Sequence, residues 1–290
     1  MPNLRELVAE ELSVPVDPRV SAIAAAIAEK HGEASRAVLF YGSCLRKHQV
    51  EGLMLDFYLV VSGYRQAYRK RWLALANRLI PPNVFYFEKD GLAAKYAVLS
   101  EADFERECGP GARSTSVVAR FAQPARLVWS ADARAQAKAI DWVSRCAPTL
   151  LAWTAPLAPE DTPALDLWKR AFKLTFGAEL RAERSDRSSE IVDFDRQRYE
   201  RFARAIDRGT AGSRRTWSRW WKRRERKGKL LSVARLAKAS ATFAGGAEYI
   251  AWKINRHAGT KIELKPWQRR WPLVAGLTLL PRLLKSGAVR

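Results

Sequence analysis

A single carboxylate inside an apolar run is the feature that most constrains the fold of this chain. Residues 38–41 and 53–61 are two apolar runs that flank a Gly-Ser pair and a short polar loop, and Asp56 lies within the second run. Both runs predict buried strands. Burying an unpaired carboxylate costs several kcal/mol, so Asp56 needs a cation or hydrogen-bond donors beside it.

Composition predicts a folded protein in a reducing compartment. The chain has 290 residues, enough for two domains, with 48% hydrophobic and 28% charged residues. Three widely spaced cysteines form no CxxC pair, which argues against a disulfide framework and against a thiolate metal site. The first residues include acids and do not resemble a secretory signal, so we expect the mature chain to begin there.

The positive charge is concentrated in the last third of the chain. Residues 201–290 hold 23 Lys and Arg against 4 Asp and Glu, whereas residues 1–200 hold 28 against 26. The same third contains six of the eleven tryptophans: Trp217, Trp220, Trp221, Trp252, Trp267 and Trp271. Basic residues interleaved with Trp suit a polyanion, either nucleic acid or an anionic membrane surface, and composition does not choose between them.

The order of predicted elements indicates a mixed α/β domain over residues 1–130. Predicted helices cover residues 3–12, 18–31 and 65–79, and a short helix follows the Gly-Ser pair. Predicted strands cover residues 37–41, 54–61, 84–88, 93–99 and 126–129.

A helical second domain is predicted for residues 131–209, and a basic helical region for 210–290. Helices are expected at residues 131–146, 161–181, 190–208 and 230–255, with a Pro-rich connection at 147–163 and a linker at 209–212. The apolar run at 271–284 is about 14 residues long and contains Pro272, Pro281 and Arg282, whereas a spanning helix needs about 20 apolar residues. We expect this run to lie in the membrane interface.

The Gly-Ser pair and the aspartate together suggest a nucleotide site. Gly42 lets the backbone approach a phosphate, Ser43 offers a hydroxyl, and Asp56 in the adjacent strand is placed to hold Mg²⁺ against triphosphate oxygens. The alternative is an ordinary turn followed by a solvated edge aspartate. A second acid two residues after Asp56 would complete a metal pair, but Tyr58 stands there; Glu88 is either the missing acid or a solvated strand end.

Four segments in order carry a family resemblance: YGS (41–43), LDF (55–57), AAKYAVLS (93–100) and RFAQPARLV (120–128). They resemble the mitochondrial-type CDP-diacylglycerol synthases, a family of phosphatidate cytidylyltransferases in the nucleotidyltransferase superfamily. FGAELRAE (176–183) and ATFAGGAEYI (241–250) are similar to later family segments. Cys44 and Ala97 depart from the pattern, since each replaces a family glycine.

The resemblance implies an α+β protein in which a nucleotidyltransferase-like domain with a mixed sheet precedes a winged-helix-like helical domain and a basic amphipathic C-terminal region. It implies the reaction of CTP with phosphatidate to give CDP-diacylglycerol and pyrophosphate, with Mg²⁺ or a related divalent ion. The site residues that we assign on this basis are Asp56 and Lys95 as catalytic residues, Asp56 and Glu88 as metal ligands, and Gly42, Ser43, Tyr41, Arg46 and Arg181 as nucleotide-binding residues. Glu179 is a weaker candidate.

Two observations from the residues themselves bear on this assignment. Lys95 lies in an otherwise apolar run, where a cation requires an anionic partner. Phosphatidate is a membrane lipid, which gives the basic, Trp-bearing tail a purpose, and we expect a cytoplasmic protein that is peripheral on the membrane. His31 and His48 receive no role.

Two alternatives remain open at this stage. One is another nucleotidyltransferase that acts on RNA or a small molecule. The other is a non-catalytic protein that binds membrane or nucleic acid on a degenerate nucleotidyltransferase scaffold, as Tyr58 and Cys44 suggest.

Overall fold

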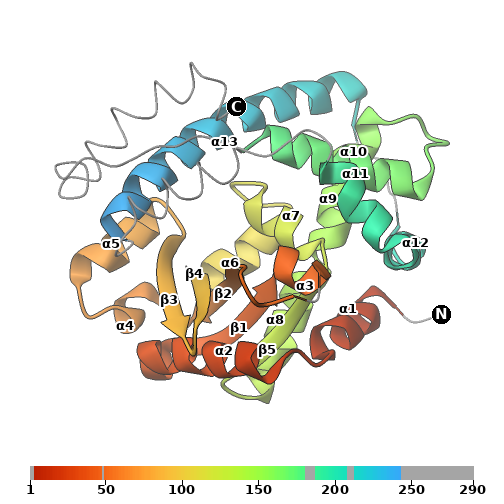
Figure 1. The fold of residues 1–290 in the computed structure, drawn as a ribbon. Coiled ribbons are helices and arrows are strands. Elements are labelled where there is room, and N and C mark those ends of the chain that lie inside the picture. Colours follow the sequence, from red (N-terminus) through yellow and green to blue (C-terminus); the bar gives the residue numbers. More distant parts are fainter. Residues whose placement is uncertain (1–2, 48, 180–186, 208–211, 243–290) are drawn as a thin grey trace.

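Five strands in one mixed sheet form the centre of this α+β protein (Figure 1). The computed structural model describes residues 3–47, 49–179, 187–207 and 212–242. The strands are β1 (Ser35–Tyr41), β2 (Leu55–Val61), β3 (Asn83–Lys89), β4 (Leu92–Ser100) and β5 (Ala125–Ser130). Each lies within two residues of its predicted position, so the predicted mixed sheet is confirmed.

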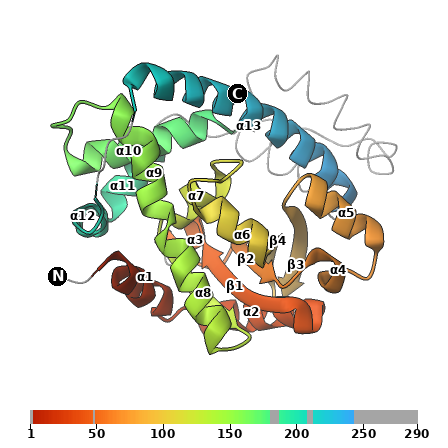
Figure 2. The ribbon, with the colours of Figure 1, turned by 180° about the vertical axis from the view of Figure 1, so that it is seen from behind.

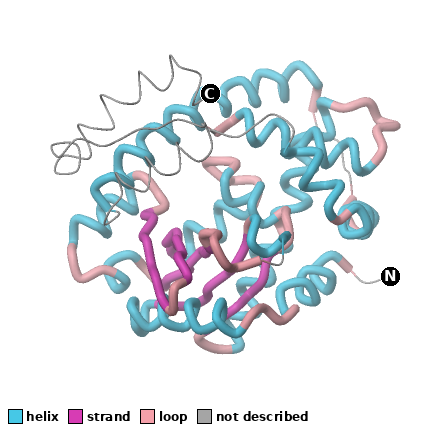
Figure 3. The backbone as a smooth tube through the Cα atoms, in the orientation of Figure 1, coloured by secondary structure: helices cyan, strands magenta, loops and turns pink. Residues whose placement is uncertain are grey.

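The order of the strands is β3-β4-β2-β1-β5. β2 and β4 are parallel, and the other neighbours are antiparallel. The parallel pair requires a crossover, which the chain makes through α4 (Tyr64–Ala67), α5 (Arg71–Leu79) and β3. The central strands are nearly continuous apolar runs because helices cover both faces of the sheet, as the tube drawing shows (Figure 3).

Side-chain alternation divides the sheet into two faces. Phe40, Phe57 and Tyr96 point to one face, where α2 (Pro18–His31), α4 and α5 cover them. Leu39 and Tyr58 point to the other face, which is covered by α1 (Leu4–Ser13), α6 (Glu101–Cys108), α7 (Ser116–Phe121) and α8 (Ala133–Ser144) (Figure 2). Asp56 precedes Phe57 in β2 and therefore lies on the same face of the sheet as Tyr58.

The helices differ from the sequence prediction in several places. The predicted connection 147–163 contains α9 (Cys146–Thr154) and the short 3-10 helix η2 (Ala155–Leu157). Pro148 does not prevent α9, because it lies in the first turn, where the backbone N–H has no partner within the helix. The single helix expected at 65–79 is split into α4 and α5, and α6 and α7 were not predicted.

Three further helices follow α9: α10 (Ala164–Gly177), α11 (Arg187–Phe194) and α12 (Arg196–Arg204). The last two divide the helix predicted at 190–208. The boundaries after residues 130 and 209 stay a prediction, and one buried cluster continues across both, from Leu7 to Trp221.

A buried ion pair joins the first helix, α1, to α12 in the helical part of the chain. The guanidinium of Arg198 in α12 donates to both carboxylate oxygens of Glu11 in α1 and, at 3.0 Å, to the carbonyl oxygen of Ala122. It also lies 4.1 Å from the ring centroid of Phe202. The first helix and the helical part are thus fixed to the turn that precedes β5.

Helix α13 (Arg214–Thr242) contains the basic cluster and packs along the body of the protein. Its three tryptophans, Trp217, Trp220 and Trp221, recur at helical spacing and face inward. Trp221 is buried and donates from Nε1 to the Trp153 carbonyl oxygen at 2.8 Å. These three tryptophans thus pack against the body of the protein, and the binding of a polyanion by the basic region stays a prediction. Trp252, Trp267 and Trp271 lie outside the described residues.

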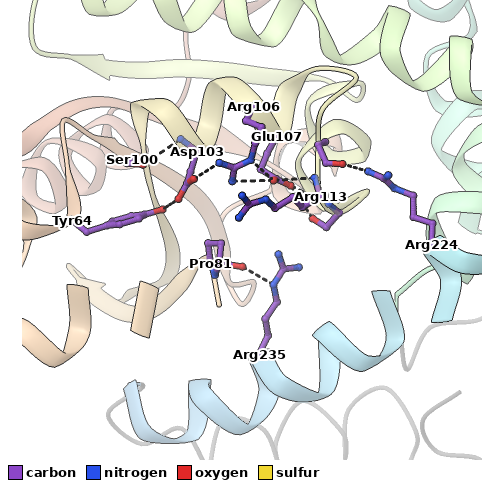
Figure 4. Close-up of polar contacts among 11 residues, drawn as sticks. Tyr64, Pro81, Ser100, Asp103, Arg106, Glu107, Arg113, Arg224 and Arg235 are labelled. Carbon is purple, nitrogen blue, oxygen red and sulfur yellow. Dashed lines mark hydrogen bonds and ion pairs between the residues drawn. The ribbon is translucent and has the colours of Figure 1, made fainter. Parts of the chain in front are cut away.

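The rest of the inner face of α13 binds backbone carbonyls of the body (Figure 4). Arg224 donates to the carbonyl oxygen of Ala112, and Arg235 donates to that of Pro81 at 2.8 Å. Lys238 donates to the carbonyl oxygen of Pro82 at 2.7 Å. Between them, Gly228 lies so close to α10 that a Cβ atom there would be 2.0 Å from the Ala178 carbonyl oxygen.

Among the described residues, no helix combines the length and the apolarity that crossing a bilayer requires.

The contact at Gly228 predicts that a Gly→Ala substitution in this helix destabilises the protein, the opposite of its usual effect. Gly→Ala inside a helix usually stabilises by about 1 kcal/mol, but Gly228→Ala should lower the free energy of unfolding by about 1–3 kcal/mol because the new methyl group overlaps the Ala178 carbonyl. Denaturant unfolding measures the change. Gly177→Ala is the matched control, since a Cβ there meets nothing within 4 Å, and it should be neutral or stabilising. An equal response of the two variants would contradict the packing of α13.

Candidate functional site

Asp56 lies at the beginning of β2, paired with Tyr41 of β1 on one side and Lys95 of β4 on the other. The parallel register places Asp56 and Lys95 directly beside each other on one face of the sheet. Asp56 Oδ1 is 2.9 Å from Lys95 Nζ, and the two side chains are 17% and 26% exposed. The Asp56 carboxylate is thus paired with the Lys95 ammonium group and is still partly exposed to solvent. A carboxylate that binds a metal ion carried by a substrate has to be accessible in this way.

Gly42 is required by this carboxylate for two reasons. Its φ of +101° lies in the region that favours glycine. A Cβ at Gly42 would also lie 2.9 Å from Asp56 Oδ2. The expectation that Asp56 faces the Gly-Ser turn agrees with this geometry, and the turn leads directly into α3 (Ser43–Lys47), where the Arg46 N–H donates to the Gly42 carbonyl at 3.3 Å.

Two groups beside Asp56, the Tyr41 hydroxyl and the Cys44 thiol, have raised pKa values. Burial, and secondly the negative charge of Asp56, raise the pKa of the Tyr41 hydroxyl above its usual range and that of the Cys44 thiol to about 11. Cys44 is buried in the core below the turn, and its thiol donates to the Met54 carbonyl oxygen at 3.3 Å. Its side chain therefore fills the core and does not narrow the turn where a phosphate would approach.

Tyr58 occupies the position of a second carboxylate for a packing reason. Its ring is buried, with centroid distances of 5.4 Å to both Tyr41 and Phe121 and 6.2 Å to Phe104. The helices α6 and α7 supply the two phenylalanines and close this part of the sheet. Tyr58 therefore fills an aromatic cluster, and the charges of Arg120 and Arg235 act on its hydroxyl, so β2 brings one aspartate to the site.

A second polar network adjoins the site and was mostly missed by sequence reasoning. Arg120 in α7 donates to Glu179, with Nη1 3.4 Å from the carboxylate, and Ser116 donates to the same carboxylate. Burial acts to lower the pKa of Arg120, but Glu179, with Asp56 among the smaller contributors, outweighs it and holds the pKa well above its ordinary value. Arg120 lies within the family-like segment RFAQPARLV (120–128), and this was the one feature of the sequence that pointed to it. Arg235 of α13 also reaches Ser116, at 3.1 Å from its hydroxyl.

The remaining predicted site residues are placed as follows. Glu88 lies near the end of β3, where it accepts a hydrogen bond from the Tyr86 hydroxyl at 2.5 Å and is exposed. Arg46 donates to Gln123 Oε1 at 3.0 Å, which connects α3 to the loop before β5. Arg181 and His48 lie outside the described residues. The roles of Glu88 and Arg46 stay predictions.

His31 has a structural environment. Its ring nitrogens lie 3.0 Å from the Ala67 carbonyl oxygen and 3.2 Å from the Tyr96 hydroxyl, and burial lowers its pKa. This agrees with its receiving no role.

The donor set fits a divalent ion that arrives with a nucleotide. In the part of the chain that the structure describes, no three His, Cys, Asp or Glu side chains are grouped to hold a metal. Mg²⁺ in proteins is commonly bound through one or two carboxylates together with substrate phosphates. Asp56 would be such a carboxylate, with Lys95 2.9 Å from it to meet a phosphate oxygen.

The contact between Gly42 and Asp56 predicts an energetic coupling. Gly42→Ala should lower the free energy of unfolding by about 1–3 kcal/mol, because both its φ and the Asp56 carboxylate oppose a side chain. In Gly42→Ala/Asp56→Ala the carboxylate is gone, so the double variant should lose less stability than the sum of the single variants, by about 0.5–2 kcal/mol. Denaturant unfolding of the four proteins measures this coupling.

Gly91→Ala is the matched control for the backbone contribution. Gly91 also has a positive φ, of +73°, but a Cβ there meets nothing within 4 Å. Its substitution should show no coupling to Asp56→Ala. Additive effects at Gly42 and Asp56 would mean that the two residues are not in contact.

Comparison of the chain with known protein families and with curated proteins finds no match, so the candidate site stands on its geometry and on its motifs.

Proposed function

We propose that this protein is a CTP:phosphatidate cytidylyltransferase that works at a membrane surface on a nucleotidyltransferase-like scaffold, with a winged-helix-like second part. The observation that carries the proposal is the arrangement of Asp56 against Gly42 and beside Lys95. It supports the proposal because three of the ordered motif segments, YGS, LDF and AAKYAVLS, supply these residues from three neighbouring strands.

The proposed reaction needs little proton transfer. A phosphate oxygen of phosphatidate, already anionic near neutral pH, attacks the α-phosphorus of CTP; a new P–O bond forms, and the bond to the β-phosphate oxygen breaks to release pyrophosphate. Catalysis then depends on positioning and on neutralisation of charge. This is a reason why one carboxylate suffices: no substrate hydroxyl has to be deprotonated.

Each residue has a role in this scheme. The Gly42-Ser43 turn receives the phosphates, and Lys95 holds a phosphate oxygen with its ammonium group. Asp56 would hold Mg²⁺, which when bound supplies positive charge to the phosphate oxygens. Lys95 Nζ and Asp56 Oδ1 lie 2.9 Å apart, so the groups that this scheme assigns to a phosphate oxygen and to Mg²⁺ stand side by side.

The outer face of α13 supports membrane contact through charge. Its exposed residues include a run of cations along the helix: Arg214, Arg215, Arg219, Lys222, Arg223, Arg226, Lys227 and Lys229. Basic residues near an anionic leaflet contribute about 1 kcal/mol each. In the described part of the tail it is therefore charge, and not tryptophan, that suits the surface on which phosphatidate lies.

The proposal predicts a specific product. Purified full-length protein with vesicles that contain phosphatidate, Mg²⁺ and each of the four nucleoside triphosphates should form lipid-linked nucleotide from CTP alone. Asp56→Asn and Lys95→Met should each lower kcat/KM by about a hundredfold or more, because each removes charge at the transferred phosphate. Asp90→Asn is the control: it removes an exposed carboxylate from the β3–β4 turn, at a φ that Asn also tolerates, and should leave activity unchanged.

The other outcomes separate the alternatives. Nucleotide transfer to RNA or to a small acceptor, with none to lipid, would indicate a different nucleotidyltransferase. No transfer with any nucleotide, together with vesicle or RNA binding, would indicate a non-catalytic protein. Full activity of Asp56→Asn would overturn the assignment of the site.

A further inference from the structure

Helix α5 exposes its large apolar side chains. Trp72, Leu75 and Leu79 are 48%, 58% and 69% exposed. Their spacing of three and four residues places them on one side of the helix. Single exposed hydrophobic residues are ordinary, but three in one stripe with a tryptophan among them mark an interaction surface.

The inner side of α5 consists of Ala74, Asn77 and the partly buried Leu73, and the hydrogen bonds of Asn77 fix this orientation. Asn77 is fully buried; its amide donates to the Val98 carbonyl oxygen at 2.9 Å and accepts the Asn83 N–H. The Asn83 side chain in turn donates to the Leu73 carbonyl oxygen at 3.0 Å. Rotating α5 to bury its leucines would break these bonds, and an unsatisfied buried amide costs about 1–3 kcal/mol.

The C-terminal end of α5 is also fixed. Arg235 and Lys238 of α13 bind the carbonyls of Pro81 and Pro82 that follow the helix. Figure 1 shows the last part of α13 beside α5. The apolar stripe is therefore presented outward by contacts at both its inner side and its end.

Charge identifies the kind of surface that fits this stripe. The segment from residue 64 to residue 80 contains no Asp or Glu. It carries five cations, all of them exposed: Arg65, Arg69, Lys70, Arg71 and Arg78. Apolar residues including Trp on one side, with basic residues around them, are the composition of helices that lie in the interface of an anionic bilayer.

We propose that α5 is a membrane-contact helix that inserts Trp72, Leu75 and Leu79 between the headgroups of an anionic phospholipid bilayer. The guanidinium and ammonium groups around the stripe contact lipid phosphates. This contact is separate from the basic face of α13. It does not depend on the proposed cytidylyl transfer, because any anionic lipid supplies the partner.

The test reads the environment of α5 directly in the full-length protein. Leu75→Cys is labelled with an environment-sensitive fluorophore; the native cysteines Cys44, Cys108 and Cys146 are all buried, which directs the label to residue 75. Vesicles of phosphatidylcholine and phosphatidylglycerol, without phosphatidate or CTP, are added. The emission from residue 75 should shift to the blue and rise, and vesicles of phosphatidylcholine alone should have a much smaller effect. Phe194→Cys, at a residue 54% exposed on α11, is the matched control and should show no change.

Vesicle sedimentation of a triple variant of the apolar stripe is a second, independent test. Trp72→Ser, Leu75→Ser and Leu79→Ser combined should weaken partitioning onto the anionic vesicles about tenfold or more, whereas Val14→Ser with Phe194→Ser should not. Unchanged partitioning would overturn the proposal. So would a label at residue 75 that does not respond to vesicles, or one already in an apolar environment without them. In that last case, dependence on protein concentration would indicate a second copy on α5, and independence would indicate coverage by the chain's own residues.

Discussion

The candidate site depends on the parallel pairing of β2 with β4. This pairing sets Asp56 and Lys95 side by side, and it meets the cost of a charge in the middle of a sheet with a 2.9 Å ion pair. The antiparallel pairing of β2 with β1 then brings the Gly42 turn against the free oxygen of the same carboxylate. A shift of either register by one residue would turn Asp56 to the opposite face, into the apolar cluster around Phe40 and Phe57.

The two faces of the sheet are covered by different kinds of helix. On the side of Tyr58, α6 and α7 cover the sheet with aromatic packing, while the side chain of Asp56, at the beginning of β2, stays 17% exposed. On the other side, the crossover between the parallel strands contains α5, which buries an asparagine and presents its tryptophan and leucines outward. The same crossover that makes the ion pair possible thus also carries the proposed membrane contact.

The strands were predictable from the sequence because apolar runs between turn residues are a local signal. The ion pair was not: Lys95 was recognised as a cation that needs an anion, but its partner follows from strand register, which is not a local property. The inward tryptophans of α13 show the converse limit. Trp217, Trp220 and Trp221 lie among basic residues along the chain, yet their helical spacing turns them toward the body. Trp220 and Trp221 contact Trp153 there, and the Arg224 guanidinium lies over the rings of Trp153 and Trp220. Arg120 was missed because its partner Glu179 is 59 residues away.

Binding of CTP to the purified protein, followed by titration calorimetry with and without Mg²⁺, tests the central claim most directly. If Asp56 holds a divalent ion against the nucleotide phosphates, Mg²⁺ should tighten the binding of CTP to the wild-type protein by about tenfold or more, and Asp56→Asn should abolish that gain while retaining the fold. Equal binding of CTP with and without Mg²⁺, or an undiminished effect of Mg²⁺ in Asp56→Asn, would contradict the account.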